Sequence, residues 1–534
     1  MKRVHLMLAA AVVFLVAQST FGALPEYEII DLGTLGGSSS YPLDINDDGQ
    51  VVGNSQPSRK GMGHSFLWDE VNGMVNLTDL LGETPEWDDI KIAIAINNNG
   101  QIVGRLPYEM TNPREIIRRF FLWDSESGFV ELTAFANAPL LINGDSIRAI
   151  NDNMQIVGTI LTPSLSNANN FTRSCHALLW DSVNGAIDLG TLGGNHSFAN
   201  NINESGIVVG ASETGNLNET HAFVWDSDNG MINLGTLNGN KSSAWAINNL
   251  DKVVGASVLN ERDENNREIN HAFIWTQTDG MVDIHDSNYL SSIALGANDA
   301  DQVVGVISNN ISIDHLHGSF GFPESFLLPP LRGVPRMRRI LPLISAPATD
   351  CDPFLWDKRY GMVNLNNLLD EDSGWDHLKS AKDINYKGQI IGIGYINGEQ
   401  HAFLMNPVLI IPAEVEIRPG TLNLSSRGKF NCNIKLPEDY DVAEINTDSI
   451  LLADTIEPDQ VRVDERNQVA TAIFNREGLR DILSQAGEVE LTVSGELTDG
   501  TRFEGTAAIK VIDRATRAKQ AATIGPKRHR RGRK

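Results

Sequence analysis

The sequence predicts an all-β protein, a seven-bladed β-propeller followed by an Ig-like antiparallel β-sandwich. Three observations support this prediction. A unit of about 50 residues recurs seven times, each unit holds four short apolar runs, and the recurrence stops near residue 408. The runs are rich in Val, Ile, Phe and Trp and are bounded by Gly, Asn and Asp, which favours strands and tight turns over helices.

The first 22 of the 534 residues predict a signal peptide. Lys2 and Arg3 precede an apolar stretch, residues 6–17, that is too short to span a bilayer, and small residues lie before Ala23. A buried N-terminal helix is the alternative. No later run reaches the roughly 18 apolar residues of a membrane helix. We therefore expect export to the cell surface or the extracellular space, without a transmembrane helix.

The most regular run of the repeat ends in a glycine. Its copies are INDDGQVVG (45–53), INNNGQIVG (96–104), INDNMQIVG (150–158), INESGIVVG (202–210), INNLDKVVG (247–255), ANDADQVVG (297–305) and INYKGQIIG (384–392). The closing glycines are 51, 54, 52, 45, 50 and 87 residues apart, so the sixth unit carries an insertion. Such a period is the signature of a repeat architecture.

Two further runs accompany each copy. One is HSFLW (64–68), FFLW (120–123), HALLW (176–180), HAFVW (221–225), HAFIW (271–275), PFLW (353–356) and HAFLM (401–405). The other is IIDLGTL (29–35), MVNLTDL (74–80), FVELTAF (129–135), AIDLGTL (186–192), MINLGTL (231–237), MVDIHDS (281–287) and MVNLNNL (362–368). Consecutive apolar residues predict strands covered on both faces, as in a propeller blade between two neighbours.

The lengths of the links predict the pairing of strands. HAFVW and MINL are joined by a short link and should pair within one blade, whereas the longer, variable link from VVG to the next HAF should cross between blades. The first unit lacks a preceding HAF run. Residues 27–35 should therefore pair with residues 401–405, a clasp that closes the propeller over residues 23–408.

Three segments depart from the repeat. Residues 306–350, inserted in the sixth unit, are dense in proline, aromatic residues and arginine, and long loops of this kind are often functional. Residues 409–513 alternate as strands, with one short helix near residues 476–484 and a hairpin at the TDG of residues 498–500. Residues 514–534 have the composition of a disordered basic tail.

Charge and cysteine content narrow the function. The formal net charge is −25, and it becomes −36 for residues 23–513 once two N-terminal cations and nine Lys and Arg of the tail are left out. So acidic a body argues against a nucleic-acid partner. Cys175 and Cys351 occupy equivalent positions three units apart and should be too distant to form a disulfide.

The combined HAFVW, DLGTLGG and AINN…VVG runs, over residues 27–405, resemble the bacterial HAF-repeat family of extracellular proteins. Residues 415–452 are similar to a β-sandwich module appended to other secreted bacterial proteins. The resemblance implies secretion and a repeat fold, and it brings no activity, cofactor or catalytic residue. Arg119 and Asp352 at the histidine position, and Met405 in place of Trp, depart from the pattern.

Histidines and tryptophans of the repeat are expected to be structural. His221 and its equivalents would lie around a ring rather than converge, so each imidazole should bond to a neighbouring strand instead of sharing a metal. The equivalents are His64, His176, His271 and His401. The same reasoning assigns six tryptophans to blade cores, Trp68, Trp123, Trp180, Trp225, Trp275 and Trp356.

Two weak metal candidates stand apart. Asp44, Asn46 and Asp48 match the opening of a calcium loop, but the glutamate at the twelfth position is replaced by Ser55, and a plain β-turn with backbone-bonding Asn is favoured. His315 and His317 in the insertion would point the same way along an extended segment. Calcium is therefore the one cofactor considered, and otherwise none is expected.

No catalytic residue is assigned, because the sequence holds no nucleophile elbow, phosphate loop, HExxH or CxxC pattern. We expect a monomeric, secreted or cell-surface scaffold that binds an extracellular ligand or an envelope component at the propeller mouth or at residues 306–350. The alternative is a glycan-processing hydrolase or lyase with its site at the mouth. An enzyme should break the repeat symmetry with inward-facing Asp, Glu or His on a few blades.

Overall fold

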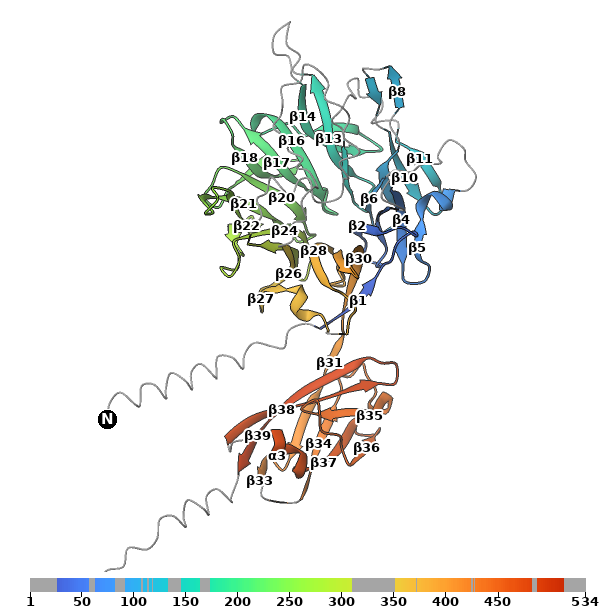
Figure 1. Cartoon of the computed structure of the whole chain (residues 1–534), viewed down its shortest axis with the longest axis vertical. Coiled ribbons are helices and arrows are strands. Elements are labelled where there is room, and N and C mark those ends of the chain that lie inside the picture. Colours follow the sequence, from blue (N-terminus) through green and yellow to red (C-terminus); the bar gives the residue numbers. More distant parts are fainter. Residues whose placement is uncertain are drawn as a thin grey trace, which may run out of the picture. The chain divides into compact units, whose positions relative to one another are not determined.

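The structure is a computed structural model that describes residues 26–56, 63–81, 92–106, 109–112, 115–117, 119–132, 146–163, 173–309, 351–370, 372–423, 426, 428–482 and 487–512. The chain forms two compact units, which divide between Pro407 and Val408 (Figure 1). The signal segment, the basic tail and residues 310–350 of the insertion, with His315 and His317, lie outside the described residues. Residues 306–308 of the expected insertion belong to a strand.

The first unit has a propeller-like all-β fold made of four-stranded groups, numbered here in chain order of their inner strands. Groups 2 to 6 are separate sheets: β6 (Ile92–Ile96), β7 (Ile102–Arg105), β10 (Phe120–Asp124) and β11 (Gly128–Glu131); β12 (Ser146–Ile150), β13 (Ile156–Pro163), β14 (Arg173–Asp181) and β15 (Gly185–Asp188); β16 (Gly193–Ile202), β17 (Val208–Thr214), β18 (Thr220–Asp226) and β19 (Gly230–Gly235); β20 (Ser242–Ile247), β21 (Val253–Arg262), β22 (Glu268–Thr276) and β23 (Gly280–Asp283); β24 (Ser291–Ala297), β25 (Val303–Ser308), β26 (Cys351–Asp357) and β27 (Gly361–Asn364).

Groups 1 and 7 share an eight-stranded sheet. Group 1 is β2 (Ser39–Ile45), β3 (Val51–Gln56), β4 (His64–Asp69) and β5 (Gly73–Asn76), and group 7 is β28 (His377–Ile384), β29 (Ile390–Ile396), β30 (Glu399–Pro407) and β1 (Tyr27–Asp31). A small hairpin, β8 (Glu109–Asn112) with β9 (Glu115–Ile117), and the short helices η1 (Leu77–Leu81) and η3 (Leu365–Leu368) complete the described elements of the unit.

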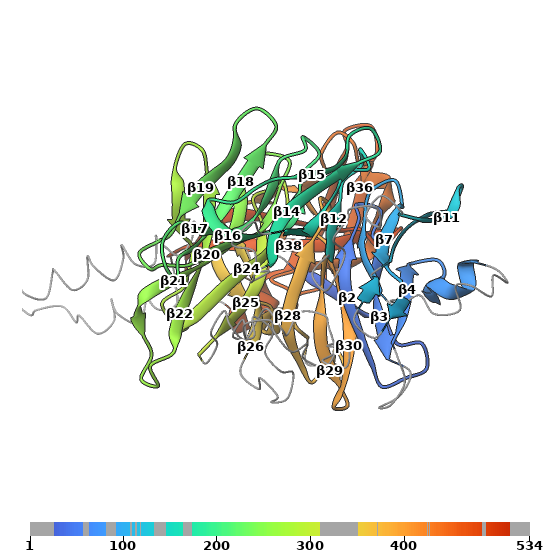
Figure 2. The ribbon, with the colours of Figure 1, turned by 90° about the horizontal axis from the view of Figure 1, so that it is seen from above.

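The chain ends of the first unit are joined by the predicted clasp. β1 pairs antiparallel with β30, from Tyr27 opposite Pro407 to Asp31 opposite Phe403. β2 also makes a parallel bridge to β30, so the last strands lie beside the first (Figure 2). The pairing of the HAF and DLG runs within one sheet is likewise confirmed, for example between β18 and β19.

The expected boundary between blades was wrong. β17 and β18, which carry VVG and HAF, are antiparallel neighbours in one sheet, as are the corresponding strands of the other groups. The variable link is therefore a hairpin loop, and in β21 and β22 the two strands themselves extend beyond the neighbouring ones. Link length misled the prediction because a hairpin tolerates long loops at little entropic cost.

Neighbouring groups pack face to face, which explains the runs of consecutive apolar residues. One cluster joins Val209, Ala222 and Val224 of group 4 to Ala244, Ile247, Val253 and Phe273 of group 5. The glycine of VVG is required instead by the packing of strands within one group: a Cβ on Gly255 of β21 would lie 2.0 Å from the Ser243 carbonyl oxygen of β20 and 2.9 Å from the Phe273 ring of β22. The repeat motif thus records a close contact between strands.

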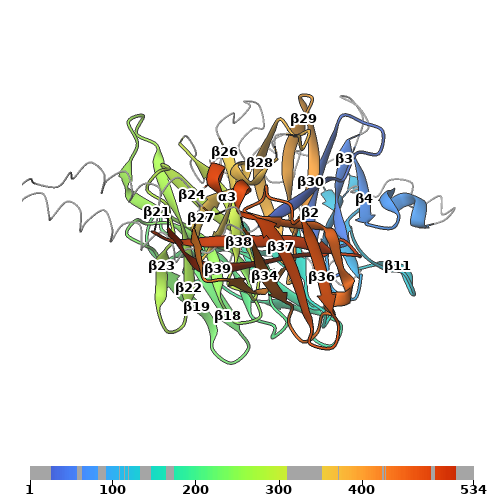
Figure 3. The ribbon, with the colours of Figure 1, turned by 90° about the horizontal axis from the view of Figure 1, so that it is seen from below.

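The second unit has two sheets that share one core. One sheet contains β31 (Ile410–Pro412), β39 (Arg502–Ile512), β38 (Gly487–Leu497) and β35 (Ile445–Leu452), with β33 (Thr421–Asn423) on β39; the other contains β32 (Glu414–Arg418), β34 (Lys429–Lys435), β37 (Val469–Asn475) and β36 (Gln460–Asp464). Figure 3 shows β38 and β39 lying across β36 and β37. The core includes Phe430 and Phe474 from one sheet and Phe503 from the other.

The second unit departs in one respect from the expected antiparallel sandwich. β31 and β33 both pair with β39 in parallel, because each returns to the same strand by a crossover rather than a hairpin. The predicted hairpin between β38 and β39 is present, and the helix is α3 (Arg476–Ile482), with η4 (Val442–Glu444) before β35. In the described part of the chain no helix is long and apolar enough to cross a membrane, and the three cysteines form no disulfide.

Candidate functional site

A closed ring of asparagines lies at one end of the inner strands. The Asn side chain that begins each turn donates its Nδ2–H to the backbone oxygen of the equivalent Asn in the next group. The seven bonds run from Asn46 to Asn97 (3.1 Å), Asn151 (3.0 Å), Asn203 (3.0 Å), Asn248 (3.2 Å), Asn298 (2.9 Å), Asn385 (3.1 Å) and back to Asn46 (2.9 Å). The ring links all seven groups.

The same asparagines organise their own turns. Asn46 Oδ1 accepts hydrogen bonds from the backbone N–H of Asp48 (3.2 Å) and Gln50 (2.9 Å). The Asn46 side chain thus uses its oxygen to stabilise its own turn and its amide N–H to bond the next group. Backbone bonding of this kind is what the β-turn interpretation of the INDDG pattern expects. Of the other two calcium candidates, Asp48 is exposed, and Asp44 Oδ2 accepts a hydrogen bond from Ile96 N–H. Among the described residues, no group of three or more His, Cys, Asp or Glu could hold a metal ion.

A second, acidic layer covers the ring. The residue after each Asn donates its backbone N–H to a side-chain oxygen in the next group, as from Asn98 to Asp152 (2.7 Å), from Asp152 to Glu204 (3.0 Å) and from Asn249 to Asp299 (2.8 Å). Burial, together with Asp152, raises the pKa of Glu204. We call this layer the mouth; it comprises Asp47, Asn98, Asp152, Glu204, Asn249, Asp299 and Tyr386.

Tyr386 is the exception within the mouth. In the other groups this position carries a side-chain carbonyl or carboxylate oxygen that accepts a backbone N–H from the preceding group, but the tyrosine side chain has no such oxygen for the N–H of Asp299. The backbone N–H of Tyr386 still donates to Asp47 Oδ1 (2.9 Å). Tyr386 is 68% exposed. The mouth therefore offers acceptor oxygens and one exposed aromatic ring.

An axial cavity of about 340 Å³ opens at the mouth. All seven groups contribute to its wall, through residues 44–47, 96–98, 149–150 and 152, 201–204, 246–249, 297–299 and 383–386. This volume lies at the lower end of the range for small-molecule sites. The cavity is thus a pre-formed site whose wall can differ from one group to the next.

Asp44 and Asp383 break the repeat in this wall. Groups 2, 3 and 5 have alanine at the equivalent position, whereas groups 1 and 7, which adjoin at the clasp, both have aspartate. The two carboxyl groups are hydrogen-bonded to each other, and Asp44 Oδ2 also accepts from Ile96 N–H (2.8 Å). Burial raises the pKa of Asp383 to about 6, and burial with the Asp383 carboxyl raises the pKa of Asp44 well above its ordinary value.

A β-bulge precedes this position in every group, so one residue of each inner strand has no opposite partner. Bulges re-aim side chains. The skipped residues are Leu43, Ile94, Arg148, Asn200, Trp245, Leu295 and Lys382. Solvent reaches Arg148. Many protein atoms nevertheless surround its guanidinium, and the resulting loss of hydration lowers the pKa of this group. Burial and the charge of Arg148 lower the pKa of Lys382 to about 8.

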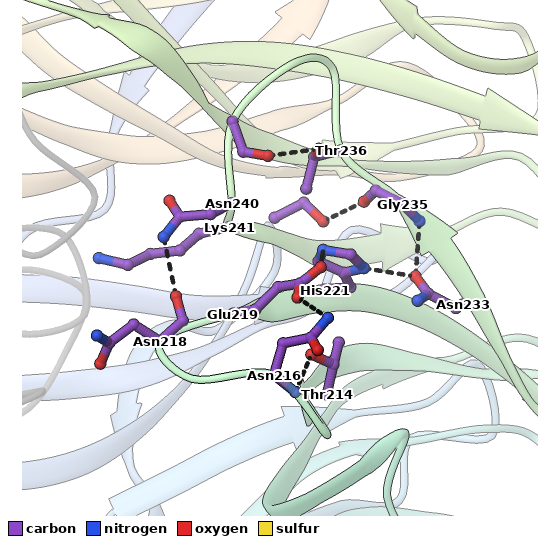
Figure 4. Close-up of polar contacts among 12 residues, drawn as sticks. Thr214, Asn216, Asn218, Glu219, His221, Asn233, Gly235, Thr236, Asn240 and Lys241 are labelled. Atoms are coloured by element: carbon purple, nitrogen blue, oxygen red, sulfur yellow. Dashed lines mark hydrogen bonds and ion pairs between the residues drawn. The ribbon is translucent and has the colours of Figure 1, made fainter.

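His221 bonds to neighbouring side chains, as predicted for a structural histidine. Its Nδ1 lies 2.9 Å from Asn233 Oδ1 on β19, and its Nε2 lies 2.9 Å from Glu219 (Figure 4). Asn233 also accepts the N–H of Gly235, which fixes the turn that follows. The HAF histidine and the polar residue of the DLG run are therefore two halves of one contact.

Other groups make the same contact with other chemistry. His176 pairs with Asp188 (2.9 Å), His271 with Asp283 (2.7 Å), and His401 with Asp31 (2.9 Å) across the clasp. Where histidine is replaced, Arg119 bonds Glu131 (2.7 Å) and Asp352 accepts from Asn364 (2.9 Å). The repeat tryptophans belong to the apolar cores of the groups: Trp68 and Trp180 are buried, and Trp123, Trp225, Trp275 and Trp356 pack partly buried against core clusters.

The sequence interpretation missed Asp383, Lys382 and Arg148. Asp383 stands in DINYKG, the one other repeat copy that begins with aspartate as DINDDG does, and the clasp places these two copies side by side. The shared aspartate of these two adjacent copies could have predicted the contact between Asp44 and Asp383.

No protein-family model matches the sequence, and no curated protein is significantly similar to it. Among solved structures, TolB from Acinetobacter baumannii has a TM-score of 0.30 at 13% identity over 48% of this chain and 53% of its own. Pyrococcus horikoshii acylaminoacyl peptidase has a TM-score of 0.38 at 9% identity over 75% of this chain and 59% of its own. An oligogalacturonate lyase in complex with manganese has a TM-score of 0.41 at 11% identity, over 73% and 96%. This chain thus spans little more than half the length of the first two.

Proposed function

We propose that this chain is an exported binding protein of the bacterial HAF-repeat type, in which the seven groups are the blades of a β-propeller and the axial cavity binds a carbohydrate. The Ig-like second unit serves as a spacer or attachment module at the cell surface. The observation that carries the proposal is the axial cavity, which is polar, pre-formed and lined by every group. No cofactor is required for such a role.

The chemistry of the mouth favours a ligand rich in hydroxyl groups. Within the described residues, Asp47, Asp152, Glu204 and Asp299 supply carboxylate oxygens, while the Nδ2 donors of the asparagine ring are spent on backbone oxygens. Oxygens that already accept one hydrogen bond can accept another, and sugar hydroxyls are donors of suitable size. The exposed ring of Tyr386 provides an apolar face beside them.

A glycan array tests the proposal. Full-length protein should bind a subset of glycans, and Tyr386→Ala should reduce that binding at least about tenfold, since one good contact is worth on the order of 1.4 kcal/mol. Leu217→Ala is the matched control, because Leu217 is 91% exposed in the loop joining β17 to β18, at the other end of the strands. Equal loss in both variants, or no glycan bound by the native protein, would refute carbohydrate binding at the mouth.

A lyase is the second candidate, favoured by the pair Asp44–Asp383 and by Lys382. Two-carboxylate hydrolases hold their carboxyl groups at least about 5 Å apart, and this hydrogen-bonded pair is closer. In a β-elimination, Lys382 would take the proton beside a uronate carboxylate, the carbon–oxygen bond would break as the double bond forms, and the shared proton of the pair would pass to the leaving oxygen. Incubation with polygalacturonate or alginate tests this candidate by the ultraviolet absorbance of an unsaturated product; no absorbance change would exclude it for these polymers.

A further inference from the structure

The mouth carries more negative charge than its hydrogen bonds require. Each bond of this layer needs one side-chain oxygen that accepts the N–H of the preceding group. In groups 2 and 5 an amide supplies it, with bonds of 2.8 Å to Asn98 Oδ1 and 3.1 Å to Asn249 Oδ1. Groups 1, 3, 4 and 6 supply it from carboxylates, those of Asp47, Asp152, Glu204 and Asp299. The hydrogen bonds of the layer therefore explain these oxygens but not their charges.

No cation neutralises these four carboxylates within the described part of the chain. None of them forms an ion pair there, and the described wall of the axial cavity holds no Lys, Arg or His. Lys252, in a turn of the same layer, pairs instead with Asp301. Lys382 lies outside the cavity wall, where the charges of Asp383 and Asp44 act on it. Because a recess lined by charges of one sign attracts the opposite sign, the mouth favours a ligand with a positive charge.

The carboxylates of groups 1, 3 and 4 form a continuous arc. Asn98 Nδ2 donates to Asp47 Oδ2 (2.8 Å) and to Asp152 Oδ2 (3.3 Å), so one amide nitrogen joins these two carboxylates. The N–H of Asp152 donates in turn to Glu204 Oε2 (3.0 Å). Burial, followed by the charges of Asp152 and Asp47, raises the pKa of Glu204, as expected where like charges crowd together. A cation placed along the arc would relieve this repulsion.

Asn201 gives an independent indication of a ligand. It lies in the cavity wall in group 4, at the position that Ala149 and Ala246 occupy in the neighbouring groups. Although Asn201 is partly buried, its side-chain amide forms no hydrogen bond with any described residue. Polar side chains that are shielded from solvent usually have a partner. A hydroxyl group of a bound sugar can be that partner, since it both donates and accepts.

We infer that the axial cavity binds an amino sugar, with its ammonium group among Asp47, Asp152 and Glu204 and a hydroxyl group at Asn201. The inference rests on the proposed carbohydrate-binding function and names the class of ligand. An ionised carboxylate has about four acceptor positions, and the mouth uses only one or two on each member of the arc. Tyr386 adjoins the arc, because its N–H donates to Asp47 Oδ1 (2.9 Å). The size of a hexosamine suits a cavity of about 340 Å³.

Calorimetric titration of the full-length protein with three matched sugars tests the inference. At pH 6.5, where its amine is protonated, D-glucosamine should bind at least about tenfold more tightly than D-glucose, which has a hydroxyl group instead. The same margin should separate it from N-acetyl-D-glucosamine, whose nitrogen is uncharged. Raising the salt concentration from about 0.05 to 0.5 M should weaken the binding of glucosamine and leave that of glucose unchanged, because screening acts on the charge.

Variants locate the recognition. Asp152→Asn combined with Glu204→Gln keeps an acceptor oxygen at both positions, as in groups 2 and 5, and should abolish the preference for glucosamine over glucose. Asp48→Asn is the matched control and should retain it, because Asp48 is exposed in a turn outside the cavity wall. Asn201→Ala should weaken the binding of all three sugars, since it removes a contact with a hydroxyl group. If the double variant does not fold, the comparison of sugars on the native protein still decides.

The outcomes separate the inference from the proposed function. Equal binding of glucosamine and glucose, both reduced by Tyr386→Ala, would overturn the selection of an ammonium group and leave carbohydrate binding at the mouth intact. A preference for glucosamine that persists in the double variant would overturn the placement of the ammonium group on the arc. Binding of calcium chloride with no sugar bound would overturn both, because the carboxylates would then serve a bare cation.

Discussion

Gly296 departs from the repeat and leaves space for Asp383. This residue stands at the position of Asp44 and Asp383 in group 6, and a Cβ there would lie 2.6 Å from Asp383 Oδ1 and 2.9 Å from Asp383 Cα. The absence of a side chain in one group thus makes room for a carboxyl group of the next. Departures from the repeat on neighbouring strands are coupled in this way.

Gly296→Ala should therefore lower the free energy of unfolding by about 1–3 kcal/mol, the usual cost of overpacking, and it should displace Asp383. Thermal unfolding followed by circular dichroism gives the change in stability. Gly215→Ala is the control, since its Cβ would meet the nearest atom at 3.8 Å. An unchanged Tm for Gly296→Ala would show that the Asp383 carboxyl is not held against group 6.

Asp383 also predicts a pH dependence. Its pKa is raised from 3.8 to about 6, so the native state binds the proton more tightly than the unfolded state. The stability that this proton contributes is complete below pH of about 4 and is lost as the pH rises through 6. Asp383→Asn, which mimics the protonated form, should lack this loss.

The comparison is made on the difference between native protein and variant, measured as Tm from pH 4 to 8. The native protein should lose stability relative to Asp383→Asn across this window. The double variant Asp44→Asn with Asp383→Asn should depend on pH even less than the single variant, because burial still raises the pKa of Asp44 when Asp383 is replaced. Parallel curves for native protein and Asp383→Asn would contradict the shared proton.

At the scale of the strand, one contact tolerates three chemistries. The third and fourth strands of a group are tied twelve residues apart by His–Asp or His–Asn bonds, by the Arg119–Glu131 ion pair, or by Asp352 with Asn364. Each combination places one donor and one acceptor at the same positions of β18 and β19 or their equivalents. The apparent degeneracy of the second and sixth units is thus a change of partners rather than a lost contact.

A double-mutant cycle on group 2 tests this equivalence. Glu131→Gln should cost up to about 1 kcal/mol of unfolding free energy, since the pair is partly exposed and the Arg119 guanidinium holds the pKa of Glu131 below its ordinary value. Arg119→His and Glu131→Asp should each lower the free energy of unfolding, and the double variant that combines them should regain most of that free energy, because it recreates the His–Asp pair of other groups. A double variant as unstable as the sum of its single variants would show that the contact is specific to group 2.

The strands could be predicted from the sequence because their apolar runs recur in every unit, and the clasp could be predicted because the two ends of the repeat region carry complementary runs. HAFLM has no DLG run after it, IIDLGTL has no HAF run before it, and β1 pairs with β30 as that complement requires. The blade boundary was misplaced because loop length does not identify a hairpin. Asp44 was a weak calcium candidate beside the favoured β-turn, whereas in the structure its carboxyl group is hydrogen-bonded to that of Asp383. Lys382 and Arg148 lie at a bulge that no residue pattern predicts.

At the scale of the whole unit, the asparagine ring binds the first group to the last. Asn385 donates to Asn46 O (2.9 Å) and to Gln389 Oε1 (2.7 Å), and its Oδ1 accepts from Gln389 N–H (2.9 Å). Asn385 is 5% exposed. Removing the side chain leaves buried groups without their partners, which is more costly than losing an exposed bond.

Asn385→Ala should accordingly lower the unfolding free energy by about 1–3 kcal/mol and should leave the second unit folded. Differential scanning calorimetry measures both effects. Asn72→Ala, which removes hydrogen bonds to Asp69 in an exposed turn, should change stability by less than about 0.5 kcal/mol. Equal effects of the two substitutions would mean that the ring contributes little to closure.

The asparagine ring has one more consequence. Its bonds pass head to tail from each unit to the next and close on themselves, which is the arrangement of a cyclic assembly of seven identical subunits. In such an assembly every substitution appears seven times, and one lysine at the axis would mean seven mutually repelling lysines. Because a single chain carries all seven copies here, Lys382, Arg148 and Tyr386 can each occur once. Covalent linkage frees the axis from its symmetry, and an asymmetric ligand can be recognised there.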